Sequence, residues 1–151
     1  MAMALSLKGR AIKYLAAREH SRQGLRRKLL AIEGASVDDV DALLDDLQSK
    51  GFLDEGRFVE TVVHRRATGF GTARVRQELQ RQGIDASTVV DTLARLRDSE
   101  LERARSLWLK RFGGLAQNDQ ERARQMRFLI GRGFGADVVQ KIVRGRSGEE
   151  E

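Results

Sequence analysis

VRQELQRQG, residues 75–83, contains the pattern that predicts the architecture of this chain. Two apolar residues one helical turn apart precede a glycine, and the same pattern stands at 25–34 (LRRKLLAIEG) and, in part, at 129–134 (LIGRGF). The aligned leucines follow one another at intervals of 50 residues: Leu29, Leu79 and Leu129. A fixed period of this length is typical of repeat proteins. A repeated unit makes a long surface and leaves few unique residues for a catalytic pocket.

Composition favours helices over strands. Leucine, alanine, arginine, glutamate and glutamine dominate the 151 residues and are good helix formers, and proline is absent.

No stretch approaches the ~18 apolar residues of a membrane span, and the first residues lack the pattern of a secretion signal. The absence of cysteine excludes disulfides and thiolate metal sites and agrees with a cytoplasmic location.

Nine short helices are predicted from capping residues and glycines. Residues that favour helix N-termini precede most of the apolar periodic stretches: Ser21, Ser36, Asp54, Thr72, Asp85 or Ser87, Ser99 and Asn118. Ser99 with Glu102 forms a capping-box pattern and predicts the start of a separate helix. Glycines that follow such stretches predict left-handed C-terminal caps: Gly34, Gly51, Gly83 and Gly133.

The nine helices fall into three groups, so the sequence predicts an all-α fold. We expect three tandem three-helix repeats that form an elongated, curved array. The predicted boundaries are 7–53, 54–98 and 99–146, followed by an acidic tail at 147–151. Each unit is too small to be comfortably stable alone, so neighbouring units are expected to stack.

Charge predicts an anionic partner. The formal net charge is +6 and the pI is about 10.3. Basic residues gather at 18–28, 65–81 and 122–146, and each stretch includes the second helix of a repeat. We predict that these stretches form one basic face, made of Arg18, Arg22, Arg26, Arg27, Arg65, Arg66, Arg74, Arg76, Arg81, Arg124, Arg127, Arg132 and Lys141. The alternative is a solvated surface whose arginine stems cover apolar side chains.

Few residues suggest catalysis or metal binding. His20 and His64 have no neighbour at metal-ligand spacing and are expected to lie on the surface or at a helix flank. The carboxylates of Asp38–Asp39 and of Asp45–Asp46 point in different directions on a helix and predict a solvated acidic face. No nucleophile stands beside a base in the sequence, so we expect no catalytic residue, no metal and no cofactor.

Glycine and aromatic residues have structural explanations. Gly69-Phe70-Gly71 lacks the Lys-Ser/Thr of a phosphate-binding loop and predicts a turn between helices. Four aromatic residues are spaced like core anchors, with base-stacking platforms as the alternative: Trp108, Phe112, Phe128 and Phe134.

The chain resembles the RecX family. The likeness rests on residues 15–21 (LAAREHS) and 25–29 (LRRKL), followed by 47–58 (LQSKGFLDEGRF), 65–83 (RRATGFGTARVRQELQRQG) and 124–134 (RQMRFLIGRGF). These motifs extend over almost the whole chain, and their order and spacing are more specific than any one of them.

The resemblance implies a cytoplasmic, non-enzymatic modulator of the RecA recombinase. Family members resemble a crescent of three-helix units that binds the RecA–single-stranded DNA filament. They limit filament extension, ATP hydrolysis and strand exchange. For this chain we therefore expect a monomer that binds the filament, and single-stranded DNA directly or through it, by means of the basic face.

Two other functions stay open on the residues alone. A helix-turn-helix-like unit could bind DNA directly, with Arg74-Val75-Arg76-Gln77 as the nearest base-reading candidate. The second possible function is that of a nuclease, but the sequence contains no cluster of metal ligands, which argues against it.

Gly24 departs from the family pattern, which has glutamate three residues after the serine. Without that glutamate, Ser21 keeps only half of a capping box, and glycine adds backbone entropy to the unfolded chain. We predict that Gly24→Glu stabilises the protein. Gly56 likewise stands where the family often has a polar helix former.

Overall fold

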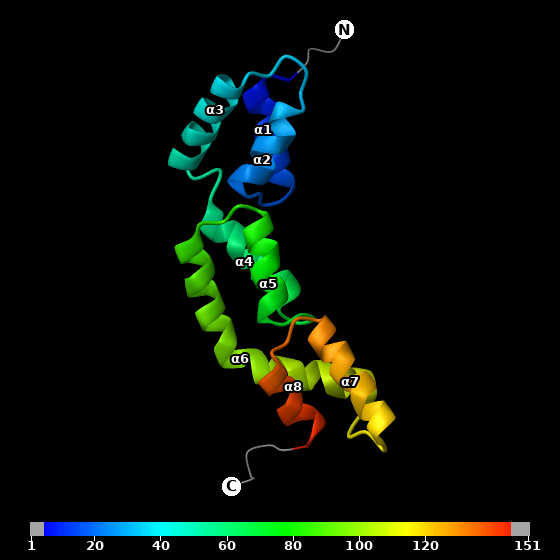
Figure 1. Ribbon diagram of the computed structural model, residues 1–151. Helices are drawn as coiled ribbons and strands as arrows, with labels where there is room; N and C mark the ends of the chain where they lie inside the picture. The colour runs from blue at the N-terminus through cyan, green and yellow to red at the C-terminus, as the bar shows by residue number, and fades with distance from the viewer. Residues whose placement is uncertain (1–4, 146–151) are drawn as a thin grey trace. The chain divides into compact units, whose positions relative to one another are not determined.

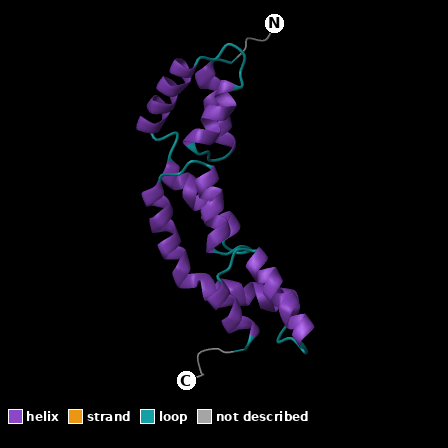
Figure 2. Ribbon diagram, in the orientation of Figure 1, coloured by secondary structure: helices purple, strands orange, loops and turns teal. Residues whose placement is uncertain are grey.

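The computed structural model describes residues 5–145, which form eight α-helices and no strand (Figures 1 and 2). The helices are α1 (Leu7–Ala17), α2 (Arg22–Leu30), α3 (Val37–Ser49), α4 (Glu55–Arg66), α5 (Thr72–Arg81), α6 (Ala86–Phe112), α7 (Asp119–Gly131) and α8 (Ala136–Val143). The all-α prediction is confirmed. No helix in this part of the chain has the length and apolarity that a membrane crossing requires. The predicted acidic tail lies outside the described residues.

The prediction of nine helices is wrong because α6 is one continuous helix of 27 residues. No glycine or proline stands in it to end a helix near Ser99. Instead of capping, the Ser99 hydroxyl donates to the carbonyl of Leu96 (3.3 Å) and accepts from Arg103 Nε (3.0 Å). The predicted repeat boundaries stay a prediction.

The chain divides into two compact units. The first comprises residues 1–61 together with 81–84. Within it α1 and α3 both pack on α2 (Figure 1). Its core consists of side chains that are almost fully buried: Ala11, Leu25, Leu29, Val40, Leu44, Leu47 and Leu53.

The second unit comprises residues 62–80 and 85–151, described as far as Gly145. Here α7 and α8 pack on α6 and on each other (Figure 1). One core cluster joins these three helices: Ala104, Trp108, Leu129, Phe134, Val139, Ile142 and Val143. Trp108 and Phe134 are thus the core anchors that their spacing predicts.

The repeated pattern has the same structural role in each copy. Leu29, Leu79 and Leu129 have no exposed surface. The glycines that follow them adopt positive φ, as predicted: Gly34 (86°), Gly83 (73°) and Gly133 (92°). The third copy differs one turn earlier, where the buried Gln125 replaces an aliphatic residue. Its side-chain oxygen accepts a hydrogen bond from Trp108 Nε1 (2.9 Å).

Most predicted caps are confirmed. The side chains of Ser21, Ser36, Asp54, Asp85 and Asn118 accept hydrogen bonds from backbone N–H groups in the first turn of their helices. Asp85, not Ser87, caps α6. Thr72 is the first residue of α5 and does not cap it, because its hydroxyl donates to Glu100 Oε1 (2.8 Å).

Candidate functional site

The turn 69–71 between α4 and α5 is held against the turn after α7. The Gly71 N–H donates to the Arg132 carbonyl (2.7 Å), and the Ala73 N–H donates to the Gly133 carbonyl (3.2 Å). A Cβ atom on Gly71 would lie 2.5 Å from the backbone of Gly133, so only glycine fits this close approach. The expected turn is confirmed, and its packing fixes the position of Phe70.

Three arginines surround the half-buried ring of Phe70. Their guanidinium carbons lie 4.9 Å (Arg74), 4.9 Å (Arg132) and 5.3 Å (Arg66) from the ring centre. Arg74 Nη1 also donates to the Gly131 carbonyl (2.6 Å), and Arg132 Nη1 donates to the Gly69 carbonyl (3.1 Å). These bonds orient the guanidinium groups, and each cation is attracted to the face of the ring.

Arg132 continues this arrangement to a second aromatic pair. Its guanidinium carbon lies 5.1 Å from the centre of Phe128, and Phe128 meets Phe112 edge to face, with ring centres 5.4 Å apart. Arg111 lies 5.1 Å from Phe128, and Arg124 lies 5.9 Å from Phe112. We call the set the arginine–phenylalanine cluster: Arg66, Phe70, Arg74, Arg111, Phe112, Arg124, Phe128 and Arg132. Phe112 and Phe128 are half-buried, so the prediction of core anchors holds only in part.

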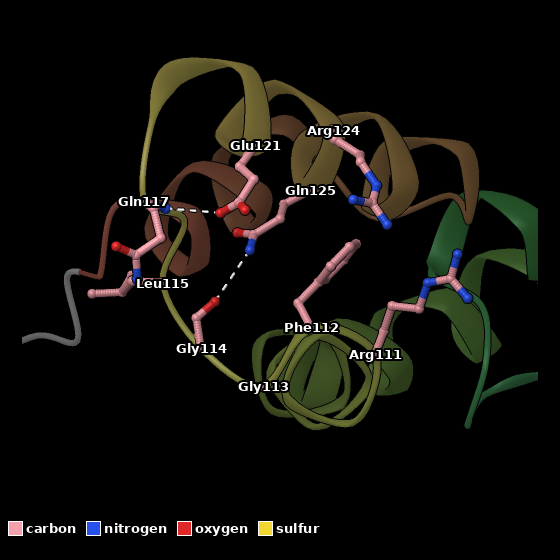
Figure 3. A pocket seen from close by; sticks show the side chains of 9 residues that line it. All are labelled: Arg111, Phe112, Gly113, Gly114, Leu115, Gln117, Glu121, Arg124 and Gln125. Carbon is pink, nitrogen blue, oxygen red and sulfur yellow. Dashed lines mark hydrogen bonds between the residues drawn. The ribbon is translucent and has the colours of Figure 1, made fainter.

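The cluster borders a pocket of about 770 Å³ at the C-terminal end of α6. Figure 3 shows the Phe112 ring between the side chains of Arg111 and Arg124. Across the pocket, Glu121 Oε1 accepts from the Gln117 N–H (2.9 Å), and Gln125 Nε2 donates to the Gly114 carbonyl (3.1 Å) (Figure 3). The wall therefore combines an aromatic face with two cations, next to a carboxylate held by the loop.

Two charged residues of α6 form hydrogen bonds with the two turns that carry the cluster. Arg103 Nη1 donates to the carbonyls of Ala67 (2.9 Å) and Phe70 (3.0 Å), and burial lowers the pKa of this guanidinium. Glu100 is 7 % exposed and accepts from the Gly135 N–H (2.9 Å) as well as from Thr72. One helix thereby fixes both turns that carry the cluster.

The cluster is suited to oxyanions such as phosphate and carboxylate. A guanidinium whose face lies on an aromatic ring still presents N–H groups at its edge, where phosphate or carboxylate can bind in bidentate fashion. Among residues 5–145 no group of three or more His, Asp or Glu side chains could hold a metal ion.

In the first unit, two of the predicted basic residues bind the acidic helix beside them. Arg22 Nη2 lies 2.8 Å from Asp45 Oδ1, and Arg26 Nε lies 2.8 Å from Asp41 Oδ1. The Arg26 guanidinium lowers the pKa of the Asp41 carboxyl by donating this hydrogen bond. Asp46 lies 3.2 Å from Lys50 Nζ. The side chains of Asp45 and Asp46 are 73 % and 40 % exposed, so this face is solvated as predicted, and its carboxylates also form ion pairs.

The remaining predicted basic residues do not belong to the arginine–phenylalanine cluster. Arg18, Arg27, Arg65, Arg81, Arg127 and Lys141 are exposed, and Arg76 is half-buried. Arg65 and Arg66 lie 3.5 and 3.4 Å from the largely buried carboxylate of Glu78. Arg111 is a member of the cluster that the sequence analysis missed. The Arg-Phe dipeptide at 111–112 also occurs at 57–58 and 127–128, so it does not single out Arg111, and no local pattern identifies this member.

His20 flanks α2, one of its two predicted positions, but it does not lie on the surface, because it is only 5 % exposed. Burial is the main cause that lowers the pKa of its imidazole. Its Nε2 lies 2.9 Å from Lys28 Nζ, which donates this hydrogen bond. The two are eight residues apart in the sequence, and local patterns do not show the contact.

These features define an all-helical protein with an arginine-rich surface cluster. Residues 54–93 match the family model described as RecX, second three-helix domain, and residues 98–143 match RecX, third three-helix domain. The regulatory protein RecX of Leptothrix cholodnii is 56 % identical over 140 residues, which cover 93 % of this chain and 88 % of the relative. The chain belongs to the RecX family of regulatory proteins.

Further relatives agree with this assignment. The regulatory protein RecX of Herminiimonas arsenicoxydans is 45 % identical over 97 % of both chains. The crystal structure of RecX from Lactobacillus salivarius is 18 % identical, with a TM-score of 0.76 over 92 % of this chain and 93 % of that one. A second crystal structure of regulatory protein RecX has a TM-score of 0.75 at 22 % identity. The match covers 90 % of this chain and 70 % of that one. The two structures support the fold.

Proposed function

We propose that this protein regulates the RecA recombinase by binding the RecA–single-stranded DNA filament. Binding limits filament extension, ATP hydrolysis and strand exchange, and so restrains recombination, DNA repair and the SOS response. The protein acts as a cytoplasmic monomer, without a cofactor and without catalysis of its own. Membership of the RecX family supports the regulatory role, and the arginine–phenylalanine cluster is the observation that carries the binding mechanism.

The cluster favours an anionic partner for two reasons. Its arginines are already held by rings and backbone carbonyls, so less side-chain entropy is lost when they bind phosphate or carboxylate. Its aromatic faces offer apolar contact between the cations. The proposed interface comprises this cluster and the other exposed residues of the predicted basic face. Arg22 and Arg26 contribute least, because aspartates already neutralise them.

The test is ATP hydrolysis by RecA on single-stranded DNA, with the protein titrated in at several salt concentrations. We expect hydrolysis to fall as the protein is added, and the inhibition to weaken steeply with salt because counterions are displaced on binding. Absence of inhibition at every ratio would overturn the proposed function. Inhibition that is insensitive to salt would overturn the electrostatic mechanism alone.

Direct regulation through duplex DNA is the weaker alternative. Base reading by α5 would need the guanidinium of Arg74, which already contacts Phe70 and the Gly131 carbonyl. A footprint on a defined duplex in the absence of RecA would favour this alternative.

A further inference from the structure

The pocket at the C-terminal end of α6 carries three different kinds of group on its wall. Its volume of about 770 Å³ is typical of a ligand-binding pocket, and its lining includes Arg111, Phe112, Glu121 and Arg124. In Figure 3 the Phe112 ring lies between the two arginine side chains on one side and Glu121 with the loop 113–117 on the other. The pocket therefore offers an aromatic ring, two cations and a carboxylate to one ligand.

The two arginines keep their charge available. Arg111 and Arg124 are exposed, and each guanidinium carbon lies 5.9 Å from the centre of the Phe112 ring. Within residues 5–145 neither guanidinium forms an ion pair with a carboxylate. Since guanidinium groups bind phosphate oxygens in bidentate fashion, this side of the pocket can hold a phosphate.

The carboxylate of Glu121 is fixed on the other side of the pocket. Its Oε1 accepts from the Gln117 N–H (2.9 Å), and its own backbone N–H donates to Asn118 Oδ1 (2.8 Å). A carboxylate has about four acceptor positions, so the group can still accept hydrogen bonds from a ligand. Next to it, no atom lies within 4 Å of a Cβ built on Gly113 or on Gly114, which leaves room for that ligand. The pocket thus favours a ligand with N–H donors at one end and an anionic group at the other.

A guanine nucleotide combines these requirements. Its base is planar and can stack on a phenyl ring, as unpaired bases commonly do in proteins that bind single strands. The Watson–Crick edge of guanine presents two donors side by side, N1–H and N2–H, which one carboxylate accepts as a pair. Thymine has a single donor between two carbonyl oxygens, and these oxygens would repel the carboxylate. The phosphate is separated from that edge by the base and the sugar, so it is left for the arginines.

We propose that this pocket binds an unpaired guanine nucleotide of single-stranded DNA. The base stacks on Phe112, its Watson–Crick edge donates to Glu121, and the adjoining phosphate binds Arg111 and Arg124. The inference rests on the proposed function, because it names the nucleotide that one part of the proposed interface selects. An acidic peptide is a poorer ligand, since its carboxylates bring no donor to Glu121 and are repelled by it.

The first experiment measures binding without RecA. Two fluorescein-labelled pentanucleotides, TTGTT and TTTTT, are titrated with the purified protein at low salt, and fluorescence anisotropy gives the dissociation constants. We expect TTGTT to bind about tenfold more tightly, the discrimination typical of a bidentate contact to a base edge. Equal dissociation constants, or tighter binding of a labelled pentaglutamate peptide than of TTGTT, would overturn the proposal.

A parallel measurement separates this proposal from the proposed function. Inhibition of RecA ATP hydrolysis is followed on poly(dT), which contains no guanine. Inhibition on poly(dT) together with equal binding of the two pentanucleotides would overturn the guanine site and leave the proposed function in place. Absence of inhibition together with a preference for TTGTT would support the guanine site and contradict the proposed function.

Variants separate the assigned roles. Glu121→Gln keeps an acceptor for the Gln117 N–H and should reduce the preference for TTGTT to about one. Phe112→Leu should weaken TTGTT binding by about tenfold, the usual cost of losing one stacked base, with helical circular dichroism as the check on folding. Arg124→Gln should weaken both strands alike, whereas Lys110→Gln, exposed at the same end of α6 but outside the pocket, should have a smaller effect. A preference for TTGTT that persists in Glu121→Gln, or equal losses in Arg124→Gln and Lys110→Gln, would overturn the proposed geometry.

Discussion

Several arginines of the two units have different partners, although Arg65 and Arg66 of the second unit also pair with a carboxylate, that of Glu78. In the first unit, Arg22 and Arg26 of α2 bind aspartates of α3, so their charge is largely spent within the unit. In the second unit, Arg74, Arg132 and Arg124 lie on phenylalanine rings. A ring holds a guanidinium in place without neutralising it. The difference shows that a count of basic residues does not predict a binding surface, because the partner of each cation decides whether its charge is available.

The largest effect is expected from Gly71→Ala, which disturbs the turn that holds Phe70. A Cβ atom would meet the Gly133 backbone, and overpacking of this kind costs about 1–3 kcal/mol of unfolding free energy. Fluorescence of Trp108, the single tryptophan, reports unfolding of the second unit in urea. Gly114→Ala is the control, because no atom lies within 4 Å of the added Cβ. Equal urea midpoints for the two variants would contradict the close approach.

The comparison itself is tested by two double variants that remove the same charge. Arg74→Gln with Arg132→Gln should weaken RecA inhibition by about tenfold, or about 1.4 kcal/mol. Arg22→Gln with Arg26→Gln should weaken it less than about threefold, because these arginines already bind aspartates. The measurement is the concentration that halves RecA ATP hydrolysis, with helical circular dichroism as a check on the folding of both units. Equal losses would mean that net charge alone governs binding.

A smaller gain in stability is expected from Gly24→Glu. The Ser21 hydroxyl already accepts from the Gly24 N–H (2.9 Å) and donates to Gln82 Oε1 (3.0 Å). An added Cβ would lie 3.0 Å from that hydroxyl, which must give by a few tenths of an ångström, and 3.4 Å from Gln82 Oε1, which is an ordinary contact. We therefore expect the lower end of the usual capping gain, about 0.5 kcal/mol. Thermal melting followed by circular dichroism measures this gain. Gly24→Ala is the control, because it adds helix propensity without the carboxylate. A melting temperature of Gly24→Glu below that of the unchanged protein would contradict the capping role.

The smallest expected effect is a pH dependence that His20 gives to the first unit. Its pKa is lowered in the folded protein, so the unfolded chain takes up a proton first as the pH falls. Stability should therefore decrease as the pH falls from about 6.5 toward the lowered folded value. Urea unfolding followed by circular dichroism between pH 5 and 8 measures the slope. His20→Gln should flatten it, and an unchanged slope would exclude His20 as its source.

The parts of the fold that local rules determine could be predicted from the sequence. Positive φ at Gly83 and capping by Asn118 depend on a few neighbouring residues, and both are confirmed. The continuity of α6 was missed because a serine that resembles a cap also fits inside a helix. There Arg103, one turn later, can satisfy its hydroxyl. A capping pattern alone does not predict whether such a serine caps a new helix or lies inside a longer one, because tertiary contacts decide between the two.

The candidate site could be predicted only as a set of charges. Arg132 reaches Phe70 although 62 residues separate them, and Arg26 reaches Asp41 across two helices. Such pairings depend on packing between turns and helices, which a charge count does not contain. The proposed basic face stays a prediction, and the cluster marks the part of it with a defined geometry.

The continuous α6 helix also restricts how the gene for this protein can change in length. Each added residue turns everything beyond it by about 100° and moves it by about 1.5 Å. A single insertion after Leu96 would rotate Trp108 out of its core while Leu93 stayed in place. Seven inserted residues would restore the phase to within about 20°. Codons should therefore be gained or lost in this segment only in groups near whole helical turns, whereas the loop 113–118 tolerates single ones.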